Sequence, residues 1–135
     1  MRFLPRLALL AVLCAASPIA AQEDGQGEIP RGLWQSEPDM LGVVLLVRTR
    51  GCGRNLCGRV ERAKNRGGYD APSSAVGQKV FWEMKPQADG AFFGEYRDAE
   101  ARQFRQTRVE VAGRKMRLRV CDTEGCKERI WVRVK

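Results

Sequence analysis

The chain has 135 residues and a formal net charge of +8, from 24 Lys+Arg against 16 Asp+Glu, and it contains no histidine. Without histidine, Ser-His and Cys-His nucleophilic pairs, histidine acid–base catalysis and histidine metal ligands are excluded. The length suits one domain with its own core, and the basic excess suits an anionic partner. The basic residues are interspersed with apolar ones, which is also typical of solvated strand faces.

The first 21 residues have the pattern of a secretory signal. Two arginines flank the start of an apolar run from Leu7 to Ala16, and small residues precede Gln22. The run is shorter than the about 20 apolar residues needed to span a bilayer. Cys14 offers a lipoprotein anchor as an alternative, but Leu13 is too bulky for that cleavage site. We therefore expect an exported, periplasmic protein without a stable membrane anchor.

Residues 22–30 are polar, glycine-rich and end in proline, which predicts a flexible leader before a domain over 31–135. In that domain, apolar residues alternate and turn-forming sequences recur, as in a chain of short strands. Near 79–85, the alternation places Val80, Trp82 and Met84 on one face. About eight strands are predicted, near 32–36, 42–50, 56–63, 78–85, 91–98, 103–111, 114–121 and 128–134.

Two segments depart from simple alternation. The strand near 42–50 begins GVVLLV and is apolar on both faces, so the leader, a loop or a second subunit must cover its outer side. A dimer formed through Val43–Val47 is one such cover. The longest connection, 64–77, has no period of its own and is either a lid over a barrel mouth or an ordinary surface loop.

Eight short antiparallel strands predict an all-β barrel or sandwich. A closed barrel leaves no strand edge exposed, and eight strands enclose an interior that holds side chains or one small ligand. We expect a single antiparallel up-and-down barrel.

Three short motifs follow one another along the predicted strands: Gly32-Leu33-Trp34, Leu56-Cys57-Gly58-Arg59-Val60 and Trp131-Val132-Arg133. In this order, and with Asp70-Ala71-Pro72 in the middle loop, they resemble the exported bacterial proteins grouped as domain-of-unknown-function family 2147. The resemblance covers nearly the whole mature chain and implies a lipocalin-like barrel, without implying an activity. The segment 94–98 lacks the family's proline, and Val132 replaces a threonine.

The resemblance also implies that Trp34, on the first strand, packs against Arg133, on the last strand, at the closed end of the barrel. A guanidinium over an indole face contributes about 0.5–2 kcal/mol. Both residues are therefore expected to close the barrel rather than to bind a ligand. The sequence leaves open which set on the last strand faces inward: Ile130, Val132 and Val134, or Trp131, Arg133 and Lys135.

The mature chain has two cysteine pairs of identical spacing, Cys52 with Cys57 and Cys121 with Cys126. Export favours disulfides over a four-cysteine zinc site, and the spacing differs from that of a C-x-x-C redox motif. In an up-and-down barrel the second and seventh turns lie at opposite ends, which disfavours bridges between the pairs. Facing hairpin residues meet the Cα separation that a disulfide needs, about 4.4–6.8 Å. We expect Cys52–Cys57 and Cys121–Cys126 bridges.

We expect no enzymatic activity, cofactor or metal. Glycines in 51–58 precede no predicted helix, so a nucleotide-binding loop is not indicated. Two carboxylate pairs match the residue types of a glycosidase, but their setting is that of solvated loops: Asp98 with Glu100, and Glu124 with Glu128.

The favoured function is binding of an apolar or amphiphilic small molecule in the barrel lumen. The expected lining residues are large and lie on the alternating apolar faces: Trp82, Met84, Phe92, Tyr96, Met116 and Leu118. Each could equally be ordinary core, because eight-stranded barrels are often filled by their own side chains.

Two alternatives stay open. An envelope protein could bind the disulfide-clamped loops, with Arg54 and Asn55 as contacts, as in an inhibitor. An anionic envelope polymer could bind the basic strand residues, with an affinity that falls steeply with salt: Arg105, Arg108, Arg114, Arg117 and Arg119. Nucleic acid is the least expected partner for an exported protein.

Overall fold

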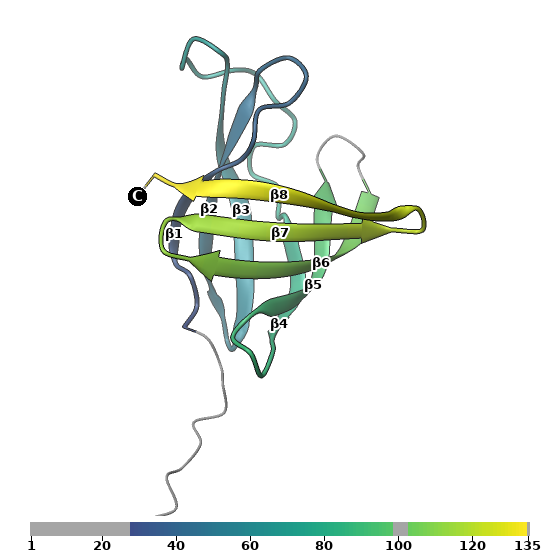
Figure 1. The fold of residues 1–135 in the computed structure, drawn as a ribbon. Coiled ribbons are helices and arrows are strands. Elements are labelled where there is room, and N and C mark those ends of the chain that lie inside the picture. The colour runs from purple at the N-terminus through teal and green to yellow at the C-terminus, as the bar shows by residue number, and fades with distance from the viewer. Residues whose placement is uncertain (1–27, 99–102, 135) are drawn as a thin grey trace, which may run out of the picture.

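A computed structural model describes residues 28–98 and 103–134 of the chain. The predicted signal sequence, most of the predicted leader, Glu100 and Lys135 lie outside these residues. The described residues form no helix, and so no helix long and apolar enough to cross a membrane. They form one closed antiparallel barrel (Figure 1).

The barrel has eight strands, each paired with its neighbours in chain order, as the sequence predicted. They are β1 (Gly32–Gln35), β2 (Val44–Cys52), β3 (Asn55–Lys64), β4 (Phe81–Pro86), β5 (Phe92–Asp98), β6 (Gln103–Ala112), β7 (Lys115–Asp122) and β8 (Gly125–Arg133). The ring closes where β1 pairs with β8, through Trp34 opposite Arg133 and Gln35 opposite Val132.

This topology gives the barrel two different ends. At the closed end, β1 begins and β8 ends, beside the turns that join β2 to β3, β4 to β5 and β6 to β7. At the open end lie the β1–β2 loop (36–43), the β3–β4 connection (65–80) and the β7–β8 turn. The β1–β2 and β3–β4 segments project together at the top of Figure 1.

The interior is filled by one hydrophobic cluster to which every strand contributes. Its most buried members have no exposed surface at all: Trp34, Val47, Phe81, Met84, Val109, Met116 and Leu118. Trp131 of β8 belongs to this cluster, whereas Val132 and Val134 are 40% and 39% exposed. The inward set of the last strand is therefore the one that contains Trp131 and Arg133.

The alternation predicted around β4 is wrong at Trp82. Phe81 and Met84 are both fully buried, because the β4–β5 register shifts between Trp82 and Lys85 and Glu83 has a positive φ of 48°. This irregularity adds a residue between two inward side chains, as a β-bulge does. Gly94 on β5 makes it possible, since a Cβ at that position would overlap the carbonyl oxygen of Glu83.

The doubly apolar strand β2 is covered largely within one chain. Leu46 and Val47 are 5% and 0% exposed although they are consecutive residues, and Val43 to Leu45 are half-buried. Burial of Leu46 therefore needs no second subunit. A dimer through Val43–Val47 stays a prediction.

Both predicted disulfides are present. The Cα atoms of Cys52 and Cys57 are 5.8 Å apart, and those of Cys121 and Cys126 are 4.0 Å apart. Cys121 and Cys126 face each other across the β7–β8 hairpin, as predicted, whereas Cys52 faces Asn55 and Cys57 faces Arg50, so the Cys52–Cys57 bridge crosses the β2–β3 ladder diagonally. The two hairpins lie at opposite ends of the barrel. Because these four sulfurs are bonded in pairs, they are not thiolates that could hold zinc. The bridges are consistent with an oxidising, exported compartment.

Candidate functional site

The closed end is sealed by a hydrogen-bonded group around Trp34. The Cζ atom of Arg133 lies 4.5 Å from the centroid of the Trp34 ring, so the contact implied by the resemblance is present. Trp34 Nε1 donates to Thr49 Oγ1 at 2.9 Å, and Thr49 Oγ1 donates in turn to the Pro30 carbonyl. Arg133 Nη1 donates to the Arg31 carbonyl at 2.7 Å, which ties the last strand to the chain entering the first.

Five of the six predicted lining residues fill the barrel instead of bordering an open lumen. Met84, Met116 and Leu118 are fully buried, Phe92 is 2% exposed and Tyr96 is 8% exposed. All five belong to the same packed cluster. Tyr96 also borders a cavity at the open end, and Phe92 borders a separate hollow at the closed end, beside Pro30 and Arg133.

Trp82, the sixth, lies outside this cluster because of the β4 irregularity. Its ring meets Phe104 edge to face at a centroid distance of 5.4 Å, and the Lys79 ammonium lies 4.3 Å from its centroid. These contacts place Trp82 on the outer wall, away from any ligand held inside the barrel.

A cavity of about 210 Å³ opens at the mouth of the barrel. Tyr96 and Trp131 form its base, with ring centroids 5.9 Å apart in an edge-to-face arrangement. Val43 and Leu45 form an apolar side wall. The cavity therefore has an aromatic and aliphatic lower part.

The rim of the same cavity is polar and held in place by the backbone. Asp39 accepts hydrogen bonds from the amides of Leu41 and Val43, both at 2.9 Å, and Glu37 accepts one from the amide of Ile130 at 2.8 Å. Across the rim, Asp98 pairs with Arg129 at 3.7 Å. The rim thus offers fixed carboxylates and one guanidinium above an apolar base.

The long β3–β4 connection borders this mouth through Ser73, Ser74 and Ala75. It is tied back to β3 by backbone bonds from Ala71 to Ala63, at 2.9 Å, and from Gly77 to Val60, at 2.8 Å. The segment predicted as a lid or a surface loop therefore covers one side of the mouth. Whether it opens stays a prediction.

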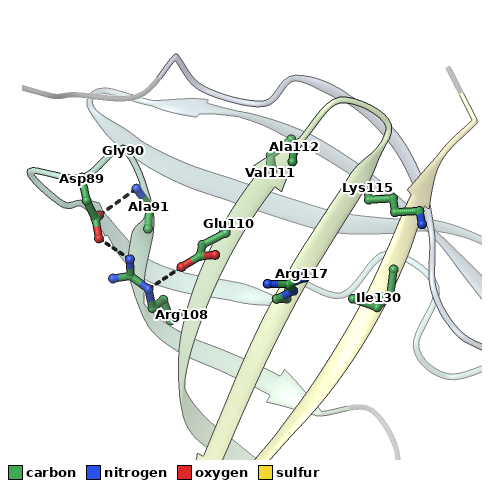
Figure 2. A pocket seen from close by; sticks show the side chains of 10 residues that line it. All are labelled: Asp89, Gly90, Ala91, Arg108, Glu110, Val111, Ala112, Lys115, Arg117 and Ile130. Carbon is green, nitrogen blue, oxygen red and sulfur yellow. Dashed lines mark hydrogen bonds and ion pairs between the residues drawn. The ribbon is translucent and has the colours of Figure 1, made fainter.

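A second hollow, of about 580 Å³, lies on the outer wall across β6 and β7 (Figure 2). Arg108 reaches between two carboxylates there, Asp89 and Glu110. These contacts lower the pKa of Asp89 and raise the pKa of Arg108, with the shared hydrogen bonds as the main cause. The Arg108 guanidinium is paired with both carboxylates, whereas Lys115, at the edge of the same hollow, makes no ion pair with the described residues.

Most of the arginines predicted to bind an anionic polymer are similarly engaged. Arg105 pairs with Asp122 at 2.8 Å, Arg117 pairs with Glu128 at 3.4 Å, and Arg114 donates to the Arg133 carbonyl. Of these five predicted arginines, only Arg119 has no ion-pair or hydrogen-bond partner for its side chain within residues 28–98 and 103–134. The predicted set does not form one free basic surface.

The remaining candidates are spread over the molecule. Arg54 is exposed at the tip of the β2–β3 hairpin, at the closed end, with Asn55 half-buried beside it. Glu128 is paired with Arg117 on the wall, Glu124 is exposed in the β7–β8 turn, and Glu100 lies outside the described residues. Asp98 lines the mouth cavity, so the Asp98–Glu100 pair stays untested, whereas Glu124 and Glu128 line none of the cavities described for residues 28–98 and 103–134.

The sequence did not identify four side chains at the mouth: Glu37, Asp39, Arg129 and Trp131. The last strand left two orientations open, so Trp131 and Arg129 could not be assigned to the interior. Glu37 and Asp39 stand in a short loop whose position depends on barrel closure.

Comparison with known proteins finds no matching family model, no matching curated protein and no matching solved structure. The resemblance to family 2147 therefore stays a prediction.

Proposed function

We propose that the protein is an exported, non-catalytic barrel that binds a small amphiphilic molecule at its open end. The observation that carries this proposal is the mouth cavity of about 210 Å³, with Tyr96 and Trp131 below a polar rim. Small-molecule sites combine an apolar surface with a few fixed polar groups in this way. The two disulfides and the predicted signal sequence support a periplasmic location.

The packed interior limits the ligand to the mouth. Phe81 stacks on Trp131 beneath the cavity, with centroids 5.7 Å apart, and is fully buried. The cavity is also smaller than the about 300–1,000 Å³ typical of drug-sized ligands. We therefore expect a compact ligand, or one end of a longer amphiphile whose remainder extends past the rim.

The proposal can be tested with N-phenyl-1-naphthylamine, an uncharged amphiphilic probe whose fluorescence rises in apolar surroundings. The mature protein should bind it saturably, and Leu45→Trp should abolish binding by filling the side wall of the mouth. Val132→Trp is the matched control, because it adds the same indole at an exposed position on the outer wall. Native mass spectrometry of protein taken from the periplasm should show a bound small molecule that Leu45→Trp lacks. Equal probe binding by both variants, or no saturable binding at all, would refute the mouth as the site.

A further inference from the structure

The closed end of the barrel carries six basic residues, here called the basic pole: Arg31, Arg50, Arg54, Arg114, Lys115 and Arg133. Five of them are exposed, and Arg133 is half-buried against Trp34. They come from the chain entering β1, the β2–β3 hairpin, the β6–β7 turn and the end of β8.

Contacts between these segments bring several of the basic residues together. Arg133 donates to the Arg31 carbonyl at 2.7 Å, and Arg114 donates to the Arg133 carbonyl at 3.1 Å. Arg31 also lies beside the β2–β3 hairpin, since a Cβ at Gly51 would be 3.1 Å from its Nη2 atom. The same hairpin carries Arg50 and Arg54, so basic residues of all four segments lie at this end of the barrel.

The charge of the basic pole is not neutralised by the described residues. None of its six cations makes an ion pair within 28–98 and 103–134. The nearby acids Asp89 and Glu110 are both engaged with Arg108, and Glu28, which lines the same hollow as Arg31 and Arg133, makes no ion pair with either arginine. Elsewhere on the barrel, arginines such as Arg48, Arg62 and Arg105 are paired with carboxylates, whereas other basic residues, such as Arg66 and Arg119, make no ion pair with the described residues. The basic pole therefore presents six cations that are not ion-paired at one end of the barrel.

Apolar side chains are interspersed with these cations. Val132 lies directly opposite Lys115 in the β7–β8 ladder and is 40% exposed, and Val134 follows Arg133 and is 39% exposed. Val111, near the β6–β7 turn, is 37% exposed. A lipid surface offers anionic phosphates and an adjoining apolar layer, whereas a soluble polyanion offers charge alone.

We propose that the basic pole docks the barrel on an anionic phospholipid bilayer. The arginines and Lys115 contact lipid phosphates, and the exposed valines contact the boundary between head groups and acyl chains. Binding at the closed end leaves the mouth cavity facing the aqueous compartment. The proposal concerns a different surface from the mouth and does not depend on a ligand there.

The test is co-sedimentation of the mature protein with vesicles of phosphatidylcholine, with and without phosphatidylglycerol, at low and high salt. We expect binding that requires phosphatidylglycerol and decreases with salt, because exposed charges are screened. Each basic residue near an anionic surface is expected to contribute about fivefold to the partition coefficient, so Arg54→Gln with Lys115→Gln should lower it about 25-fold.

The matched control is Arg119→Gln with Lys127→Gln, which removes the same charge from exposed wall positions outside the basic pole. It should leave binding close to that of the unmodified protein, and thermal melts should show that both variants fold. An equal loss in the control would mean that net charge alone governs binding, and would overturn the proposal. So would equal binding to vesicles without phosphatidylglycerol, or binding to soluble polyphosphate without any to vesicles.

Discussion

Replacing Thr49 with valine removes one hydroxyl from the closed end while keeping the shape of the side chain. Thr49 is 2% exposed and Trp34 is fully buried, so water cannot replace the lost partner. The substitution leaves Trp34 Nε1 without an acceptor and the Pro30 carbonyl without this donor. A buried polar group left unsatisfied costs about 1–3 kcal/mol. We therefore expect Thr49→Val to lower the free energy of unfolding by about 2–4 kcal/mol.

Urea unfolding of the oxidised protein, followed by tryptophan fluorescence, measures this change. With a slope of about 1–3 kcal/mol per molar urea, a loss of 2 kcal/mol moves the midpoint by about 1 M. The slope itself should not change, because the barrel buries the same surface in both proteins.

A double-mutant cycle shows whether the unsatisfied indole N–H of Trp34 causes the loss of unfolding free energy. In a Trp34→Phe background there is no indole N–H that could lose its acceptor. Thr49→Val should therefore lower the free energy of unfolding only by the part due to the Pro30 carbonyl. We expect the cost to fall by about 1–3 kcal/mol relative to the unmodified background. The same cost in both backgrounds would refute the role assigned to the Trp34–Thr49 bond.

Other predictions concern the bulge, the core, the bridges and the outer wall. Gly94→Ala should destabilise the barrel by about 1–3 kcal/mol in the same urea assay, since its methyl group would overlap the Glu83 carbonyl, and an unchanged midpoint would contradict this. Met116→Ala should cost about 2–5 kcal/mol by opening a cavity in a fully buried position, and a cost under 1 kcal/mol would mean that the barrel repacks. Reduction of both disulfides should cost about 2 kcal/mol each, because they close short loops, and the far-ultraviolet circular dichroism should stay that of a β-barrel. Because Arg108 holds the pKa of Asp89 below its ordinary value of 3.8, this carboxylate stabilises the fold above that pH and loses the effect as the pH falls further. The stability difference between the unmodified protein and Asp89→Asn should therefore shrink in acid, and a difference that does not vary with pH would exclude the ion pair as its source.

The architecture could be predicted from the sequence because it depends mainly on local signals. Alternation at Met116, Leu118 and Val120 marks an inward face, and the two-residue turns mark hairpins. The disulfide pairing followed from the number of strands between the cysteines. The Trp34–Arg133 contact, in contrast, was predicted from the resemblance to family 2147 and not from a local sequence pattern.

The candidate site depends on features that no short window of sequence contains. Trp82 lies outside the core because the β4–β5 register shifts, and the residue that permits the shift, Gly94, is on the partner strand. Trp131 borders the mouth because it lies opposite the buried Met116 in the β7–β8 ladder, which fixes the inward face of β8. The carboxylate of Glu37 takes its position from an amide on the last strand, 93 residues away. Each of these positions is set by contacts between strands and not by the pattern within one strand.

The short β1–β8 junction also has a consequence for the order of folding. Each disulfide joins cysteines five residues apart, so oxidation can fix either hairpin as soon as its two strands have paired. The junction, in contrast, joins Trp34 to Arg133 and Arg31 to Arg133, across almost the whole domain. Contacts so distant in sequence form slowly, because the chain between them must first lose its freedom. Closure of the barrel through its last strand is therefore expected to come late, on a chain whose hairpins can already be fixed by their disulfides.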